Sequence, residues 1–280
     1  MRISKIGDNP PQTFCAGAST RDMFCDLSRD AEHCLGRLVM LQRNLFQVGD
    51  GMRSRCRGQR IDQNSIRCSG CEFRDQFSRI AGAGKPIFID KPFASSVSDA
   101  EAMADLAARN GTRAFCSSAL RFSTALTDVL GTEPAGSATG ADFCGPMAIE
   151  PTSPGLFWYG VHTVEMLYAS LGTGCRSVVA ASTDEHDCLI GVWDDGRLGT
   201  IRGNRTGDND FQGLVHFAGR TAHVDIATAS RPFFSSLLDQ VMSFFKGGES
   251  PVPLATSVEM VRFMEAGNRS RESGEVVSLR

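Results

Sequence analysis

Several features that would point to a membrane or a nucleic acid are missing from this 280-residue sequence. It has no run of about 18 apolar residues, which excludes a membrane-spanning helix. The net charge is −3 and the isoelectric point is about 6.0, so nothing favours binding to nucleic acid. Residues 1–14 lack the apolar core of a secretory signal, which predicts a cytoplasmic protein. Because disulfides rarely persist in that compartment, we expect the ten cysteines to be mostly reduced thiols.

The first 79 residues lack the composition of the rest of the chain. They hold only three alanines, against 24 in the other 201 residues, but twelve of the 25 arginines and six of the ten cysteines. Their net charge is +4 (13 basic minus 9 acidic residues), whereas that of the rest is −7 (16 minus 23). They also contain no G-x-G-x-x-G turn, the usual dinucleotide-binding signature. Residues 1–79 are therefore an atypical segment.

Regular patterns begin at residue 84. The apolar run Ile87–Ile89 predicts a strand over 86–90, and an alanine-rich helix follows it. The spacing of Ser98 and Glu101 predicts a capping box at the start of that helix, and Asn110-Gly111 predicts its end. A second strand is predicted over 113–120. A strand, a helix and a strand in this order predict a parallel sheet with a right-handed crossover.

The second half of the chain has the pattern of an α+β domain. Helices are predicted over about 122–130 and 156–171, and the segment between them reads as a loose connection. Two hairpins are predicted, with turns at residues 194–196 and 218–219. Two more helices close the chain, the second beginning at a capping box from Thr256 to Glu259. These elements predict a mainly antiparallel sheet.

Lys91 is the first candidate for chemistry. The strand over 86–90 runs directly into Asp90-Lys91-Pro92, which points a long amine out of the carboxyl edge of a parallel sheet. Ligands of α/β proteins bind at that edge. In a partly desolvated cleft the pKa of such a lysine falls, and it can exchange a proton. The alternative is a solvated lysine at the end of a strand.

His162 is the second candidate. It follows the aromatic residues Phe157, Trp158 and Tyr159 at the start of a predicted helix, and Glu165 lies on the same helical face. Glu165 could orient or charge the imidazole. Gly160 would let another group approach this first turn closely. The alternative is a hydrogen-bonded histidine of the core.

These motifs together resemble the glucose–fructose oxidoreductase/inositol dehydrogenase (Gfo/Idh/MocA) family. The segment GKPIFIDKPFASSVSDAEAMADLAARNG, followed by a strand and Arg121, is similar to that family's Glu-Lys-Pro signature region, with Asp90 in place of the glutamate. Residues 160–165 resemble its Gly-x-His-x-x-Asp/Glu helix. The end of the chain, SVEMVRFMEAGNRSRESGEVVSL, resembles its last helix and strand. The likeness covers roughly residues 76–280.

The resemblance implies a Rossmann-like domain over residues 1–120, with 1–79 atypical, that binds NAD or NADP. It implies an α+β domain over 121–280 with an open, mainly antiparallel sheet that supports homo-oligomers. The implied activity is hydride transfer between the nicotinamide cofactor and a sugar, polyol or related hydroxy compound, without a metal. Lys91 and His162 would be catalytic.

The resemblance assigns the remaining site residues by position. Asp90 and Pro92 would bind the cofactor together with Lys91. The residues expected to line the substrate cleft are Arg121, Trp158, Tyr159 and Glu165.

The chain departs from this family in two places. Many members carry an aspartate four residues before the histidine, and here that residue is Trp158. The glycine turn expected near the N-terminus is also missing, with Gly7 and the pair Gly49 and Gly51 as weak candidates. The alternative function is therefore a non-catalytic relative that has lost a competent cofactor site.

Two hypotheses address the atypical front segment. One is that part of residues 1–72 is translated from a shifted reading frame, which reading the other two frames of the gene would test. The other is a zinc site built from Cys68, Cys71 and Cys56 with His33 or Cys34. Zinc is the weaker of the two, since only one C-x-x-C pair exists.

Overall fold

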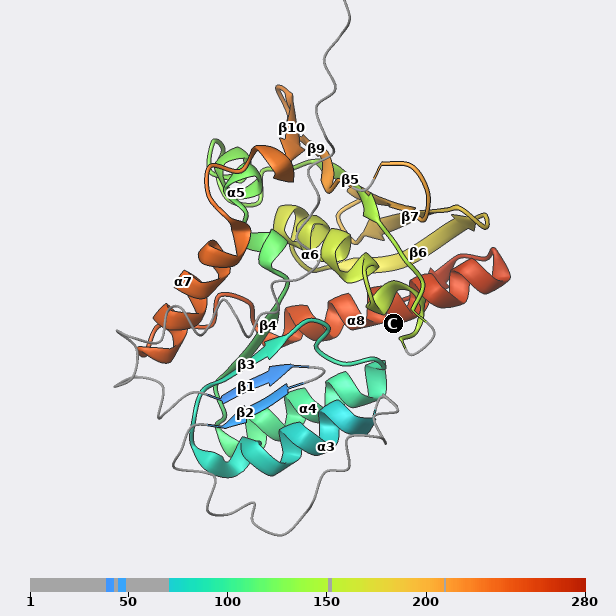
Figure 1. Cartoon of the computed structure of the whole chain (residues 1–280). Coiled ribbons are helices and arrows are strands. Elements are labelled where there is room, and N and C mark those ends of the chain that lie inside the picture. The colour runs from blue at the N-terminus through green and yellow to red at the C-terminus, as the bar shows by residue number, and fades with distance from the viewer. Residues whose placement is uncertain (1–38, 43–44, 49–70, 151–152, 209) are drawn as a thin grey trace, which may run out of the picture.

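The chain forms two sheets joined by helices. The computed structural model describes residues 39–42, 45–48, 71–150, 153–208 and 210–280 (Figure 1). A four-stranded sheet is built from residues before 118, and a seven-stranded sheet from residues after 139. The mixed α/β fold class predicted from the sequence is thereby confirmed. The weak glycine-turn candidates and most of the zinc candidates lie outside the described residues.

The four-stranded sheet has the order β2-β1-β3-β4. Strands β1 and β3 are parallel, β3 and β4 are parallel, and β2 pairs with β1 in the antiparallel sense. The parallel pair predicted from the β-α-β pattern is therefore correct. The four strands are β1 (Val39–Gln42), β2 (Leu45–Val48), β3 (Ile87–Asp90) and β4 (Ala114–Ser117).

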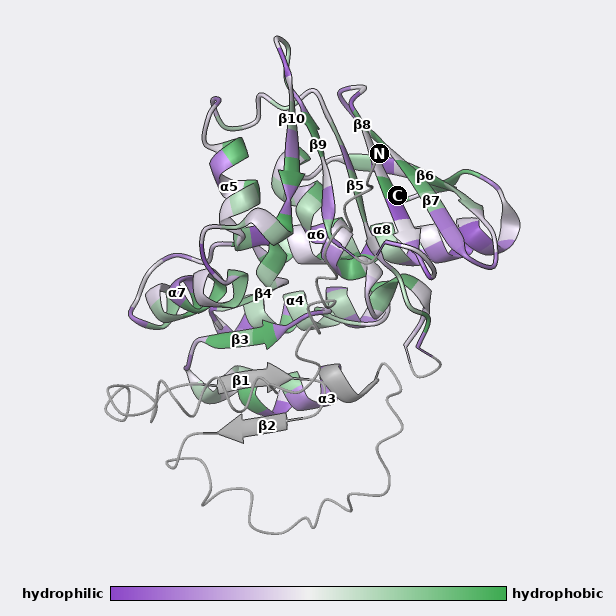
Figure 2. Cartoon of the chain, turned by 45° about the horizontal axis from the view of Figure 1, so that its top comes forward, coloured by the Kyte–Doolittle hydropathy of each residue, from purple (hydrophilic) through white to green (hydrophobic). Residues whose placement is uncertain are grey.

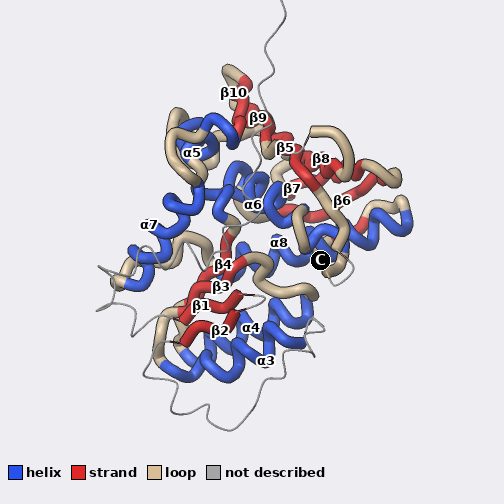
Figure 3. Tube along the Cα trace, viewed as in Figure 1, coloured by secondary structure: helices blue, strands red, loops and turns tan. Residues whose placement is uncertain are grey.

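Helices α3 (Cys71–Ile80) and α4 (Val97–Asn110) lie together on one face of this sheet (Figure 3). The capping residue of α4 is Ser96, whose Oγ accepts a hydrogen bond from the backbone N–H of Asp99. The predicted capping box at Ser98 was thus wrong by two residues. Gly111 ends the helix in the left-handed conformation, at φ 60°, as predicted.

The seven-stranded sheet has the order β10-β9-β5-β8-β7-β6-β11, and every pair in it is antiparallel except β5 with β8. The hairpins predicted at residues 194–196 and 218–219 are β7–β8 and β9–β10. Its strands are β5 (Gly140–Pro146), β6 (Cys175–Ser182), β7 (His186–Trp193), β8 (Leu198–Asn204), β9 (Gln212–His216), β10 (Thr221–Asp225) and β11 (Val277–Ser278).

Strand β5 corrects a prediction, because its residues had been read as a loose connection. It lies between β8 and β9 in the middle of the sheet. Its glycines allow close packing there: a Cβ on Gly145 would lie 2.3 Å from the ring of Phe211. The sequence GADFCGP resembles a loop, but its position between two strands makes it a strand.

Helices α6 (Gly160–Leu171) and α8 (Leu254–Ser273) cover one face of the seven-stranded sheet. Helix α8 also contacts α4 and β4, so it packs against both sheets (Figure 1). Helix α5 (Thr124–Leu130) lies beside β10, and α7 (Phe233–Phe245) packs on the short helix η2 (Ala119–Phe122). The other short helices of the described residues are η1 (Ala81–Ala83), η3 (Gly155–Phe157) and η4 (Ile226–Thr228).

The apolar core is continuous through these layers. Strand β3 is hydrophobic along its length (Figure 2), and Ile87 and Ile89 are fully buried.

The predicted capping box at α8 was wrong, because the Glu259 carboxylate instead accepts the backbone N–H groups of Gly174 and Cys175 at 2.7 and 2.9 Å. Among the described residues, no helix is long and apolar enough to cross a membrane.

Candidate active site

The candidate site lies where the carboxyl ends of β3 and β4 meet the first turn of α6. Lys91 directly follows β3, and its Nζ donates a hydrogen bond to the backbone oxygen of Trp158, at 3.0 Å. The same ammonium lies 5.2 Å from the centre of the Trp158 ring and 5.7 Å from that of Tyr159. A cation over an aromatic face is attracted by the ring quadrupole. The end of the strand and the start of the helix are therefore joined through Lys91.

The neighbours of Lys91 are the residues predicted for the cofactor. Asp90 is half-buried at the last position of β3, opposite Ser117 of β4. Pro92 is buried, and the Lys91–Pro92 peptide bond is cis. The carboxyl edge of a pair of parallel strands is where open α/β sheets bind ligands. Asp90, Lys91 and Pro92 therefore lie at the edge of the sheet where a ligand is expected.

His162 lies in the first turn of α6 and is half-buried. Its Nδ1 is 2.7 Å from the Oγ of Ser118, and its ring makes edge-on contacts with Tyr159 and Phe211, at centroid distances of 5.7 and 5.5 Å. Burial, and after it the positive charge of Lys91, lowers the pKa of His162 well below its ordinary value. The imidazole is therefore neutral at neutral pH.

Glu165 and Arg121 form an ion pair behind this histidine. The Nε of Arg121 is 2.5 Å from Oε2 of Glu165, and their side chains are 12% and 1% exposed. The other carboxylate oxygen, Oε1, accepts the backbone N–H of Ser118 at 3.0 Å. Glu165 thus holds Ser118, and Ser118 contacts the imidazole that Glu165 was expected to orient.

Two residues of the site had not been predicted, Ser118 and Phe211. Ser118 follows β4 in the segment Cys116-Ser117-Ser118, three residues before Arg121, and a hydroxyl at the carboxyl end of a parallel strand was a usable signal. Phe211 comes from the connection between β8 and β9, and no local pattern indicates that it reaches His162.

Cys116 lies beneath this cluster on β4 and is 2% exposed. Burial, followed by the negative charges of Glu165 and Asp90, raises the pKa of its thiol well above the ordinary value. Cys116 therefore stays a protonated thiol and is no nucleophile.

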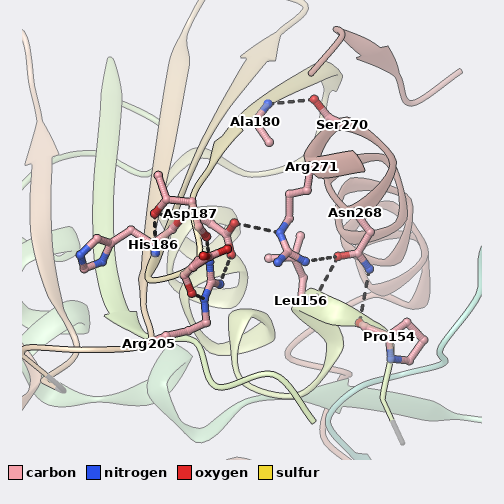
Figure 4. A network of polar contacts seen from close by, with 11 residues as sticks. Pro154, Leu156, Ala180, His186, Asp187, Arg205, Asn268, Ser270 and Arg271 are labelled. Atoms are coloured by element: carbon pink, nitrogen blue, oxygen red, sulfur yellow. Dashed lines mark hydrogen bonds and ion pairs between the residues drawn. The ribbon is translucent and has the colours of Figure 1, made fainter. Parts of the chain in front are cut away.

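The segment that carries Trp158 and His162 is held from α8 (Figure 4). The side chain of Asn268 accepts the backbone N–H of Leu156 at 3.1 Å and donates to the backbone oxygen of Pro154 at 3.3 Å. Close packing of this segment continues at Gly160, where a Cβ would lie 3.0 Å from the side chain of Leu156. The predicted role of Gly160, to permit a close approach, matches this contact.

A buried charge cluster anchors the same part of α8. Asp187 of β7 is fully buried between Arg205, 2.5 Å away, and Arg271, 3.0 Å away (Figure 4). Burial alone would raise the pKa of Asp187, but the hydrogen bond from Arg205, with the nearby Ser182 and Arg271, outweighs burial and lowers it. The cluster fixes α8 to the seven-stranded sheet.

No metal-binding group of three or more His, Cys, Asp or Glu side chains occurs among the residues that the structure describes. Of the cysteines proposed for zinc, Cys56 and Cys68 lie outside those residues, as do His33 and Cys34. Only the backbone of Cys71 is described, at the first position of α3.

Comparison with known proteins finds matches only among solved structures, since no family model and no curated protein sequence matches the chain. The scyllo-inositol dehydrogenase from Lactobacillus casei matches with a TM-score of 0.64 at 12% identity, covering 76% of this chain and 77% of that one. The WlbA dehydrogenase from Bordetella pertussis, solved with NADH and UDP-GlcNAcA, matches with a TM-score of 0.62 at 16% identity, covering 76% and 77%.

A third structural match is GenD2 from gentamicin A biosynthesis, solved in complex with NAD. Its TM-score is 0.63 at 15% identity, and the match covers 74% of this chain and 75% of GenD2. Structures of this kind are Gfo/Idh/MocA-type oxidoreductases, so the resemblance found in the sequence motifs extends to the three-dimensional structure. The chain has the fold of these dehydrogenases.

Proposed function

We propose that the chain is an oxidoreductase that uses NAD or NADP to oxidise or reduce a sugar, a polyol or a related hydroxy compound. The observation that carries the proposal is that the Lys91 ammonium and the His162 imidazole both lie against the ring of Tyr159, beside the carboxyl end of β3. The fold shared with dehydrogenases supports it. When bound, the nicotinamide supplies the acceptor or donor of the hydride.

The two candidate catalytic residues have different roles at the substrate oxygen: His162 exchanges its proton, and Lys91 stabilises its negative charge. His162 is neutral at neutral pH, so it can accept the hydroxyl proton as a carbon–hydrogen bond is oxidised. Lys91 carries a positive charge and three N–H donors, one of which bonds the backbone oxygen of Trp158. It can stabilise the negative charge that develops on the substrate oxygen. In the reverse direction the protonated histidine returns the proton.

The remaining site residues take supporting roles in this proposal. Asp90 and Pro92 hold the nicotinamide beside Lys91. The half-buried rings of Trp158 and Tyr159 offer flat surfaces to the apolar face of a sugar or cyclitol ring. Arg121 and Glu165, expected to bind substrate, are bonded to each other, and we propose that they shape the cleft by holding Ser118 and α6.

An activity screen tests the proposal. The purified protein is incubated with inositols, hexoses and sugar nucleotides together with NAD or NADP, and formation of the reduced nicotinamide is followed by its absorbance. Lys91→Met and His162→Gln should each lower turnover by about 10²–10⁴-fold. Lys85→Met, at the exposed opposite end of β3, and His223→Gln, exposed on β10, are the matched controls and should retain activity. Equal loss in variants and controls would contradict these roles.

We also propose that the chain forms a homo-oligomer through the face of its seven-stranded sheet opposite helices α6 and α8, which no described helix covers. Ile190, Leu198 and Leu214 are 38%, 52% and 38% exposed, and the strand registers place them on the same face. Exposed apolar side chains on one face of a sheet favour an interaction surface. Leu198→Asp should lower the mass measured by light scattering to that of a monomer, and a wild-type protein that is itself monomeric would contradict the proposal.

A further inference from the structure

One ring nitrogen of His162, Nδ1, has a hydroxyl partner. It lies 2.7 Å from Ser118 Oγ. Trp158 stands where related dehydrogenases of the resembled family have an aspartate, and the Glu165 carboxylate is bonded to Arg121 and to the Ser118 backbone. Because Nδ1 is committed to Ser118, only Nε2 remains for the substrate hydroxyl.

We propose that Ser118 is the positioning residue of His162: its Oγ accepts a hydrogen bond from Nδ1–H, so that the neutral ring presents an unprotonated Nε2 to the substrate. The inference rests on the proposed function, since it assigns His162 the role of a base. It goes beyond that function by naming the residue that selects the tautomer.

Ser118 is held firmly enough to fix the ring. It is 1% exposed, its backbone N–H is bonded to Glu165, and its Oγ accepts the backbone N–H of Leu120 at 3.2 Å. A hydroxyl oxygen has two lone pairs, so it can accept from Leu120 and from the imidazole together. The chain from Glu165 through Ser118 to His162 therefore sets the orientation of the ring.

The proton inventory of the reaction favours this tautomer. A neutral imidazole carries one proton, and a base at Nε2 requires that this proton be on Nδ1. When Nε2 takes the substrate proton, the ring becomes a cation and Nδ1–H keeps the same hydrogen bond to Ser118. Proton transfer then requires no rearrangement of the hydrogen bond behind the ring.

A serine partner also has a different electrostatic effect from a carboxylate. A carboxylate at Nδ1 would favour the protonated ring and raise its pKa, whereas a hydroxyl carries no charge. The positive charge of Lys91, which follows β3, therefore lowers the pKa of His162 with no negative charge at Nδ1 to oppose it. Tyr159 and Phe211 contact the ring from the segments before α6 and β9, and the charges of Arg121 and Glu165 are paired with each other.

The tautomer can be measured directly in the protein without cofactor or substrate. Histidine labelled with ¹⁵N gives long-range proton–nitrogen correlations that distinguish Nδ1–H from Nε2–H, and the spectrum of His162→Gln assigns the signals. We expect wild-type His162 to be in the Nδ1–H form at neutral pH. Ser118→Ala should convert it to a mixture of both forms, and Ser118→Thr, which keeps the hydroxyl, should retain the Nδ1–H form.

Ser117→Ala is the matched control. Ser117 is an adjacent, fully buried serine whose hydroxyl donates to the backbone oxygen of Ser118, so its removal should leave the His162 tautomer unchanged. An Nε2–H form in the wild type would overturn the proposal, as would identical tautomers in the wild type and Ser118→Ala. If Ser118→Ala does not fold, the wild-type spectrum alone still tests the proposal, because an Nε2–H form of His162 would overturn it.

This readout separates the inference from the proposed function. A chain that never turns over a sugar can still show a tautomer that depends on Ser118, and an active enzyme can show one that does not. Once a substrate is known, Ser118→Ala should lower kcat by about 10-fold or more with little change in KM. A loss confined to KM would contradict a positioning role.

Discussion

The ion pair between Glu165 and Arg121 gives the sharpest prediction about the architecture of the site. Glu165→Gln keeps the shape of the side chain but has one acceptor oxygen, while the carboxylate serves both the Nε of Arg121 and the backbone N–H of Ser118. One of these two donors therefore loses its partner. The Arg121 charge, only 12% exposed, also loses its counter-charge.

The magnitude follows from burial. Breaking a buried ion pair by removing one partner costs about 3–5 kcal/mol of unfolding free energy, because an uncompensated charge stays inside. The partial exposure of Arg121 places this variant at the lower end, about 3 kcal/mol. For a chain of this size, that corresponds to a fall in Tm of about 6–12 °C.

Urea unfolding followed by circular dichroism measures this cost. Glu101→Gln is the matched control, since Glu101 also pairs with an arginine, Arg262, at 2.6 Å, but both side chains are 40% or more exposed. Exposed pairs contribute at most about 1 kcal/mol. A cycle with Arg121→Met should give a coupling energy of about 2 kcal/mol. If Glu165→Gln costs no more than Glu101→Gln, the reasoning about burial is refuted.

Two further predictions concern the segment before α6 and its histidine. Asn268→Ala removes the hydrogen bonds to Leu156 and Pro154 and should cost about 1–3 kcal/mol of unfolding free energy. The control Asn110→Ala, at an exposed helix end, should cost less than about 1 kcal/mol. Equal costs of the two variants in urea unfolding would contradict the anchoring role of Asn268. The lowered pKa of His162 means that, as pH falls below about 6.5, the unfolded chain takes up a proton there before the folded chain does, so stability is lost on acidification. His162→Gln should show a shallower loss in that window, and an identical pH profile of Tm would contradict the assignment.

The part of the fold that was predictable from the sequence is the part that local patterns determine. The buried run Ile87–Ile89 and the helix end at Asn110-Gly111 depend on neighbours in the chain, and both were correct. Strand β5 was missed because a segment with two glycines and a proline becomes a strand only when β8 and β9 pair with it. The predicted cap of α8 failed for a related reason: at Glu259 a tertiary partner, the start of β6, took the carboxylate.

The residues of the candidate site also divide into those that local patterns predict and those that they do not. Lys91 and His162 could be singled out because each lies at the end or start of an element whose boundaries the sequence marks. The partner of His162 was expected to be Glu165, one helical turn on, because helical spacing brings them to one face. The chain instead uses Ser118, 44 residues away, and turns Glu165 toward Arg121. Contacts across such distances depend on how β4 and α6 pack, which no local pattern specifies.

The central claim is that a nicotinamide binds at the carboxyl edge of β3 beside Lys91, and a titration of the purified protein with NADH and NADPH tests it most directly. Trp158 is 5.2 Å from Lys91 and should be quenched as the cleft fills, whereas Trp193, 1% exposed in the seven-stranded sheet, is the internal reference. We predict saturable quenching at micromolar cofactor that is lost in Trp158→Phe and retained in Trp193→Phe. A folded protein that shows no saturable binding up to millimolar NADH or NADPH would contradict the claim.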